Sequence, residues 1–398
     1  MLLSSPSIAT ESHEAGLAKA DHWVSRLHLT NFRSYNRVKL ESSDGGLIVL
    51  TGANGAGKTN LLEALSMLAP GRGLRGARLS DLDRRVAGDA DPAPWAVAAR
   101  IEAPPGRIEL GTGRVPEPGR ERRIVRIDGK PAGSQQVLAE ALAVVWLTPG
   151  MSRLFTDPPA SRRRFLDRLV VGFDPAHATR VGAFDRARTE RARLLRTGRV
   201  DPAWLGALEQ NMAEKSIAIA AARLDVVSAL NATFDDGVDA FPRPQLRATG
   251  WPEELLETMP ALAAEETLFA ALAEGRARDA EQGGAVGAHR SDLAVAYAAT
   301  GMSADQCSTG EQKALLIATL LAYARRLGRH RGAMPVLLFD EVGAHLDAAR
   351  LAALFDALIN LGCQAWLTGT DRADFTALDG CAEFFSLTDS TLTEEIKA

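Results

Sequence analysis

The chain has 398 residues, of which 46% are hydrophobic and 24% are charged, and its formal net charge is −4. This length allows more than one hydrophobic core, and the slightly acidic balance gives no general sign of a nucleic-acid binder. Its three cysteines are too few for a disulfide framework and fit a reducing cytoplasm. No uninterrupted apolar run approaches the roughly 18–20 residues that cross a bilayer, and no secretory signal pattern begins the chain. We therefore expect a cytoplasmic protein without a membrane partner.

The first part of the chain alternates between strand and helix patterns. Residues 1–22 lack periodicity and predict a disordered tail. Residues 23–29 and 37–41 alternate between apolar and polar side chains, as strands do. Residues 46–51 form a short apolar run, which is typical of a strand buried on both faces. Residues 60–68 have the apolar spacing of a helix that packs on a sheet.

The remaining patterns indicate an insertion. Short alternating segments within residues 92–128, separated by Gly and Pro, predict an antiparallel β patch. Residues 153–282 are almost wholly helical in character, and strand-like patterns return after Gly283-Gly284. The predicted fold class is α/β. One domain is built from both ends of the chain (residues 23–150 and 283–398), and a mainly helical lobe (151–282) is inserted into it.

A glycine-rich loop lies between the strand at 46–51 and the following helix. Successive N–H groups in such a loop, together with a helix N-terminus, form a concave anion site. Gly52 and Gly57 allow the backbone to approach phosphate oxygens closely. Lys58 would neutralise the β- and γ-phosphates, and the Thr59 hydroxyl would bind Mg²⁺. The pattern predicts ATP and Mg²⁺ as ligands, bound by Gly52, Ala53, Asn54, Gly55, Ala56, Gly57, Lys58 and Thr59.

A second apolar run, Val336–Phe339, ends in Asp340 and Glu341. A strand of this kind places side chains at the carboxyl edge of an open sheet. We expect Asp340 to hold Mg²⁺ and Glu341 to accept a proton from the attacking water. A pair of surface acids at a strand end is the alternative. Another predicted strand, 365–370, ends at Thr370, where either a γ-phosphate-sensing side chain or a plain turn fits.

The segment Ser308-Thr309-Gly310-Glu311-Gln312-Lys313 opens a predicted helix over residues 312–326. Ser308 and Glu311 have the spacing of a capping box, and a capped helix alone would explain this segment. An exposed Ser hydroxyl and a Gly N–H at a helix N-terminus also form a phosphate cradle. Because one protomer has no evident use for two cradles on one γ-phosphate, we expect Ser308 and Gly310 to face the ATP of a partner chain.

Taken together, these motifs resemble the RecF family of bacterial recombination-repair ATPases, which are relatives of the SMC and ABC ATPases. The resemblance covers roughly residues 23–390 and implies an ABC/SMC-type P-loop ATPase head. Further similar segments are Asn31-Phe32-Arg33-Ser34-Tyr35, Gly71-Arg72-Gly73-Leu74-Arg75, residues 145–164 and residues 287–293. The chain departs from the family pattern at Gly150-Met151, Ala288 and Ser291. Thr370 stands at the switch-histidine position of transporter ATPases.

The resemblance implies a slow, DNA-stimulated ATPase that serves as a switch. Such a protein dimerises on ATP, binds DNA at single-strand/double-strand gap junctions, and helps RecO and RecR to load RecA in recombinational repair and replication restart. By the same resemblance Glu341, Lys58 and Ser308 are the catalytic candidates. Arg33, Ser308, Gly310 and Thr370 join the nucleotide-binding set, and Thr59 and Asp340 are the metal ligands.

The predicted lobe begins with an arginine-rich stretch, and residues 151–199 hold twelve arginines against five acids. Such a local excess can neutralise DNA phosphates, and the low aromatic content (6%) favours backbone contact over base stacking. An ordinary solvated helix face, or a dimer interface for residues 162–164, fits the same pattern. The candidate DNA contacts are Arg162, Arg163, Arg188 and Arg191.

Two other function classes compete with this interpretation. An SMC-like or nuclease-associated ATPase needs long coiled-coil arms, but residues 153–282 would give two arms of roughly 100 Å at most, and sustained heptads are absent. A transporter ATPase is disfavoured by the widely separated motifs, the missing switch histidine and the large insert.

Overall fold

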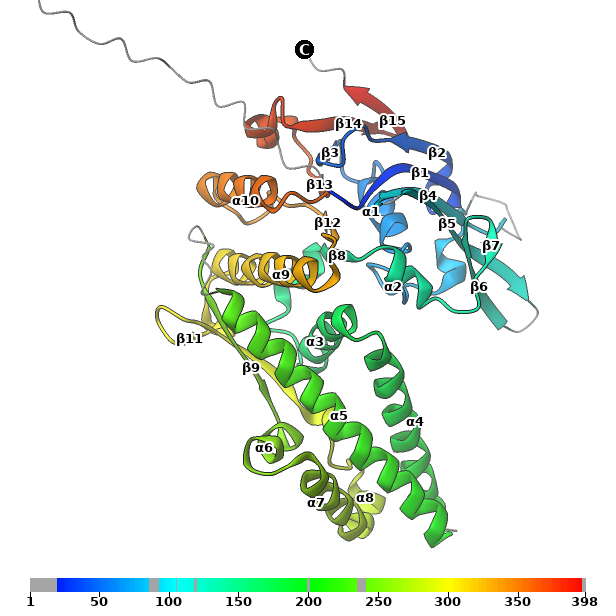
Figure 1. Cartoon of the computed structure of the whole chain (residues 1–398), viewed down its shortest axis with the longest axis vertical. Helices are drawn as coiled ribbons and strands as arrows, with labels where there is room; N and C mark the ends of the chain where they lie inside the picture. Colours follow the sequence, from blue (N-terminus) through cyan, green and yellow to red (C-terminus); the bar gives the residue numbers. More distant parts are fainter. Residues whose placement is uncertain are drawn as a thin grey trace, which may run out of the picture.

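The computed structural model describes residues 20–85, 93–104, 106–117, 120–198, 201–234 and 241–395. Most of the predicted tail, residues 1–22, lies outside these ranges. The strand-rich part and the helical part occupy opposite ends of the molecule, and helix α9 (Thr309–Arg331) lies between them (Figure 1).

A mixed sheet of six strands forms the centre of the strand-rich part, in the order β15-β14-β3-β13-β12-β8. Its members from β14 to β8 pair in parallel, and β15 is antiparallel to β14. The bounds are β3 Leu47–Thr51, β8 Val144–Leu147, β12 Val336–Phe339, β13 Ala365–Thr368, β14 Ala382–Thr388 and β15 Thr391–Glu395. Because parallel strands end at a common edge, the segments that follow β3, β12 and β13 converge there.

Helices cover both faces of this sheet, as its continuous apolar strands require. Alternate residues of β3 belong to different cores: Leu47 and Val49 pack with α9, whereas Ile48 and Leu50 pack with α1. The helices of this part are α1 Lys58–Ser66, α2 Val137–Ala141, α9 and α10 Ala348–Leu361. The short 3₁₀ helices of the chain are η1 Leu79–Leu82, η2 Pro149–Arg153, η3 Ala288–Arg290, η4 Ala304–Gln306 and η5 Arg372–Leu378.

The antiparallel patch is a second six-stranded sheet, in the order β2-β1-β4-β5-β6-β7. The sequence predicted the strands of this sheet from residue 92 onward. It did not predict that the N-terminal hairpin, β1 and β2, joins them through the pairing of β1 with β4. This sheet shares its core with α1. The bounds are β1 Trp23–Phe32, β2 Tyr35–Glu41, β4 Ala96–Ala103, β5 Gly106–Glu117, β6 Arg120–Ile127 and β7 Lys130–Pro131.

The lobe consists mainly of helices, and α4 and α5 run side by side away from the sheets (Figure 1). The helices are α3 Pro159–Phe173, α4 Ala176–Thr197, α5 Pro202–Phe234, α6 Trp251–Thr258, α7 Ala261–Glu274 and α8 Arg276–Gln282. A strand, β9 (Pro244–Thr249), was missed by the sequence prediction. It pairs with β10 (Asp292–Tyr297), which in turn pairs with β11 (Met302–Ser303), so its partners come after the helices in the chain.

Helix α5 bears on the expectation that no segment of the chain crosses a membrane. Within the described chain it is the one helix long and apolar enough to cross a bilayer, with a mean hydropathy of 1.4 over its most apolar window. Half of that window is buried inside the protein. The helix packs on α4, α6, α7, α9 and β9, so burial in the lobe accounts for its composition.

Candidate nucleotide-binding site

The glycine-rich loop joins β3 to α1 and depends on two glycines for close packing. Gly52 has φ +143° and Gly57 has φ +111°. A Cβ at Gly52 would lie 2.3 Å from the Leu387 carbonyl oxygen, and one at Gly57 would lie 2.6 Å from the Tyr35 hydroxyl. Gly55, with φ +85°, faces open space. The loop is therefore fixed against β14 and Tyr35 but open at Gly55.

The loop carries donors that an anion would satisfy. Among the described residues, no protein acceptor is found for the N–H groups of Asn54, Gly55 and Gly57. Lys58 is buried, and its Nζ donates to the carbonyl oxygens of Gly52 at 2.5 Å and Ala53 at 2.9 Å. Burial lowers the pKa of Lys58, because it disfavours the ammonium form. A phosphate group here would supply the missing acceptors and the missing negative charge.

Asp340 lies at the end of β12, where two threonine hydroxyls donate to its Oδ1. The donors are Thr59 Oγ1 and Thr368 Oγ1, each at 2.9 Å. Burial raises the pKa of Asp340, and the nearby Glu341 adds to this, while the two hydroxyl bonds oppose it. A buried carboxylate and a hydroxyl are hard oxygen ligands of the kind that Mg²⁺ prefers beside phosphates. These residues fit a Mg²⁺ held jointly by the protein and by ATP.

Thr368 was missed in the sequence, where Thr370 was chosen instead. Strand β13 ends at Thr368, which is fully buried, whereas Thr370 is exposed two residues beyond the strand. The signal was available in the sequence, because Thr368 ends the apolar run at residues 365–367 as Asp340 ends the apolar run Val336–Phe339. A γ-phosphate role for Thr370 stays a prediction.

Glu341 follows Asp340 and has an exposed side chain on an unusual backbone. Its φ is +51°, in the left-handed region, and its N–H donates to Thr368 Oγ1 at 2.8 Å. Glu341 is therefore exposed, although its neighbour Asp340 is buried. No group of three or more His, Cys, Asp or Glu side chains suited to a metal occurs among the residues that the structure describes.

The predicted capping box at Ser308 is confirmed. Ser308 Oγ accepts from the Glu311 N–H at 3.3 Å, and Glu311 Oε2 accepts from the Ser308 N–H at 2.9 Å. Ser308 is exposed at the start of α9. A Cβ at Gly310 would lie 3.3 Å from both Arg350 Nη1 and the His345 carbonyl oxygen, so a glycine keeps this helix end close to the segment after β12.

Arg33, a predicted nucleotide contact, is largely engaged within the protein. Its Nε and Nη2 donate to the two carboxyl oxygens of Glu63, each at 2.8 Å, and its Nη1 donates to the Asp81 carbonyl at 2.8 Å. The adjoining Tyr35 hydroxyl donates to the Gly57 carbonyl at 3.0 Å. The motif at residues 31–35 therefore contacts both the glycine-rich loop and α1, and it stabilises their arrangement. A nucleotide contact by Arg33 stays a prediction.

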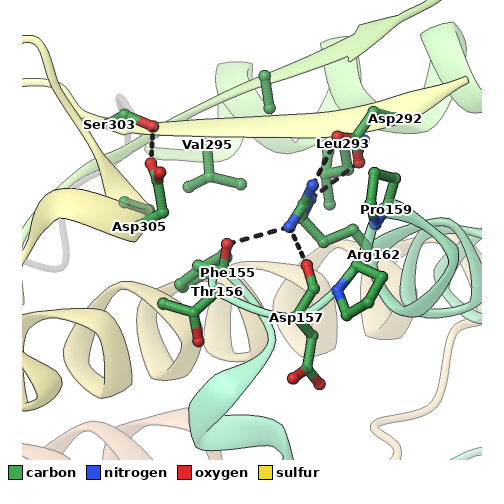
Figure 2. A pocket seen from close by; sticks show the side chains of 13 residues that line it. Phe155, Thr156, Asp157, Pro159, Arg162, Asp292, Leu293, Val295, Ser303 and Asp305 are labelled. Carbon is green, nitrogen blue, oxygen red and sulfur yellow. Dashed lines mark hydrogen bonds and ion pairs between the residues drawn. The ribbon is translucent and has the colours of Figure 1, made fainter.

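Two of the four arginines predicted to contact DNA have structural roles. Arg162 donates to both carboxyl oxygens of Asp292, at 2.8 and 2.7 Å, and to the carbonyls of Phe155 and Asp157 (Figure 2). It lies beside a cavity of about 650 Å³ between α3 and β10, which includes no residue of the glycine-rich loop. All three of its nitrogens are engaged within the protein, and a DNA contact by Arg162 stays a prediction.

Arg191 is the second of these arginines, and the prediction that it contacts DNA is wrong because the side chain is buried. Its side chain is 2% exposed, and it donates to Glu209 at 3.0 Å, Asp279 at 2.8 Å and the Leu272 carbonyl at 2.7 Å. It joins α4 to α5 and to α8 inside the lobe. The sequence pattern could not distinguish the buried Arg191 from the exposed arginines of α4, because arginines occur on every side of this helix. Arg163 and Arg188 remain partly exposed.

Fold and site together define an ABC/SMC-type P-loop ATPase head. Residues 23–391 match the family described as RecF/RecN/SMC N terminal domain. A DNA replication and repair protein RecF from Mesorhizobium japonicum is 47% identical over 93% of this chain and 97% of its own length. One from Rhizobium rhizogenes is 45% identical over 94% and 98%. The chain belongs to the RecF family of DNA replication and repair proteins.

Solved structures agree on the fold. One described as the recombination mediator protein RecF-ATPrS in the RecFOR pathway superposes with a TM-score of 0.82, at 21% identity, over 95% of this chain and 99% of the other. An Smc head domain from Pyrococcus furiosus with an extended coiled coil gives a TM-score of 0.52, at 18% identity, over 94% and 96%.

Proposed function

We propose that this protein is an ATP-switched DNA clamp. It binds Mg²⁺-ATP at the Gly52–Thr59 loop, dimerises on it, binds DNA at single-strand gaps, and works with RecO and RecR to help load RecA. The observation that supports the proposal is the hydrogen bond of Thr59 with Asp340, because one Mg²⁺-ATP half-site would require the two distant motifs to lie side by side. The pathway is supported by the similar solved RecF structure, which is that of a recombination mediator in the RecFOR pathway.

The proposed dimer depends on the exposed start of α9. Ser308 and Gly310 lie at a helix N-terminus, where partial positive charge and free N–H groups favour a phosphate. The chain already has one cradle for its own nucleotide. In this proposal the second cradle closes on the γ-phosphate of a partner, and Glu341 acts as general base in the closed site. Hydrolysis opens the dimer, so ATP serves as the switch.

DNA phosphates have a candidate site where α3, α4 and η3 meet. Arg163, Arg188 and Arg290 lie near enough to His289 to lower its pKa, which burial lowers first, to about 4. Three cations around a neutral imidazole are a concentration of positive charge in a chain of net negative charge. We define Arg163, Arg188 and Arg290 as the arginine cluster. When the dimer closes, the lobe of residues 151–282 would bind DNA through this cluster.

The alternative SMC-like function is less well supported. Its arms would have to come from the insert, but α4 and α5 pack with α6, α7, α8 and β9 in a compact lobe. The 33 residues of α5 span about 50 Å. This is far short of a long coiled-coil arm.

Light scattering during size exclusion tests the proposal. Wild-type protein with Mg²⁺-ATP and gapped DNA is expected to dimerise. Lys58→Ala should bind ATP roughly ten- to a hundredfold more weakly, since it loses charge-assisted bonds to phosphate, and should stay monomeric. Ser308→Arg should bind ATP normally but fail to dimerise. A wild-type protein that stays monomeric with both ligands would contradict the proposal, and Lys39→Ala, at an exposed site on β2, is the control.

A further inference from the structure

Lys313 is a buried lysine that the nucleotide site, as described so far, leaves without a role. It lies five positions after Ser308, in the first turns of α9, with 3% of its surface exposed. A lysine is rarely buried without a partner of opposite charge, because its ammonium group is costly to remove from water. Among the residues that the structure describes, no carboxylate forms an ion pair with Lys313. Its acceptors are backbone carbonyls.

All three carbonyls belong to the segment after β12. Lys313 Nζ donates to the carbonyl oxygen of Val342 at 2.9 Å, to that of Glu341 at 3.2 Å, and to that of Ala344. An ammonium group has three donors, and three acceptors meet it here. Burial lowers the pKa of Lys313 to about 8, with Glu341 acting in the opposite direction. The side chain thus joins the start of α9 to the backbone of the catalytic glutamate.

The backbone of Glu341 is held from two sides. Its N–H donates to Thr368 Oγ1 at 2.8 Å, and its carbonyl accepts from Lys313. Its φ of +51° is uncommon for a residue with a side chain, and such a conformation persists only where the surroundings enforce it. Thr368 provides the restraint from β13 and Lys313 provides the restraint from α9. Removing either one leaves the direction of the glutamate side chain less well fixed.

We propose that Lys313 is a positioning residue that links the Ser308–Gly310 cradle to Glu341 of the same chain. The inference rests on the proposed function, because it assigns the coupling between the two halves of that dimeric site. When the start of α9 engages the nucleotide of a partner, the three carbonyls held by Lys313 follow it. Glu341 then reaches its catalytic position only in the closed dimer. The activity of each glutamate therefore depends on the ATP that is bound across the interface.

The test compares Lys313→Met with wild type in steady-state ATP hydrolysis and light scattering. The methionine keeps the length of the side chain but removes all three donors. Nucleotide affinity and ATP-dependent dimerisation should stay near wild type. We expect kcat to fall about tenfold or more, with KM unchanged; the upper bound is the roughly 10²–10⁴-fold contribution of a general base. Lys130→Met, at an exposed position on β7, is the matched control and should hydrolyse ATP like wild type.

A double variant separates positioning from general damage. On a Glu341→Gln background, Lys313→Met should cause no further loss of kcat, since the glutamate that it positions is already absent. Two outcomes would overturn the inference without contradicting the proposed dimer. One is an additive loss of kcat in the double variant, and the other is an unchanged kcat in Lys313→Met alone. If Lys313→Met does not fold, Lys313→Gln gives the same comparison with a shorter polar side chain. A wild-type protein without ATP-dependent dimers would instead refute the proposed function.

Discussion

The Thr59 hydroxyl donates to Asp340 Oδ1 at 2.9 Å across 281 positions of sequence. Thr59 lies in the first turn of α1, which follows β3, and Asp340 directly follows β12. Strand β13 lies between β3 and β12 in the sheet. The same carboxyl oxygen accepts from Thr368 at the end of β13. The start of α1, the residue after β12 and the last residue of β13 thus meet at a single oxygen-rich point, which is where a Mg²⁺ bound to ATP phosphates would sit.

Asp340→Asn should separate stability from function. Because burial disfavours the ionised carboxylate, the amide should leave the protein without nucleotide as stable as wild type or more stable. Mg²⁺-ATP at about 100 times its Kd should stabilise wild type by about 2.7 kcal/mol, and the variant should lose most of this gain. Thermal melting with and without Mg²⁺-ATP measures both effects. Asp356→Asn, on the exposed side of α10, is the control; an unchanged nucleotide effect in Asp340→Asn would contradict the metal role.

Glu341→Gln should trap the closed dimer. The amide keeps the size of the side chain but cannot accept a proton from water, so hydrolysis should slow by roughly 10²–10⁴-fold while ATP binding continues. Light scattering should then find a dimer that persists after free ATP is removed, whereas wild type returns to monomer. Normal turnover in this variant would assign the general base to another residue.

The strands and loops of the site were predictable because each carries its own local signal. The strand Val336–Phe339 and the capping box at Ser308 were predicted correctly, since an apolar run and a Ser-x-x-Glu spacing do not depend on distant partners. The strand β9 and the buried place of Arg191 depend on strands or helices far along the chain. Lys313 is the clearest case: its three carbonyl partners lie 28–31 positions away, and nothing local marks them.

Arg191 should prove to be a stability residue. Its guanidinium is buried between Glu209 and Asp279, so Arg191→Met leaves two buried carboxylates with less compensation, although Arg276 still pairs with Glu209. Breaking such a pair costs about 3–5 kcal/mol. Urea unfolding measures the loss. Arg193→Ala, whose exposed side chain pairs with Glu190 on the same helix, should cost less than about 1 kcal/mol. Equal losses in the two variants would contradict the buried network.

The low pKa of His289 predicts that the protein loses stability in acid. The folded-state pKa is about 4 against an ordinary 6.5, so the unfolded chain binds the extra proton first as the pH falls. Stability from this group is complete above about pH 6.5 and is lost as the pH falls toward 4. The expected loss is about 1–2 kcal/mol at pH 5. Urea unfolding of wild type at pH 7 and pH 5 should show a larger difference than His289→Gln does. His28→Gln, exposed on β1, should behave like wild type.

The arginine cluster should set the salt dependence of DNA binding. Each phosphate contact contributes about 0.9 to the slope of log K against log salt, so the triple change of Arg163, Arg188 and Arg290 to Ala should lower that slope by about 2–3. Arg163 and Arg188 come from α3 and α4, and Arg290 comes from η3, so the cluster requires the folded lobe. Fluorescence anisotropy on gapped DNA over a series of salt concentrations measures the slope. Arg193→Ala removes an exposed arginine of α4 outside the cluster and should leave the slope nearly unchanged. If one Arg193→Ala change lowers the slope as much as the triple variant does, DNA follows the outer face of α4 and the arginine cluster is not its binding site.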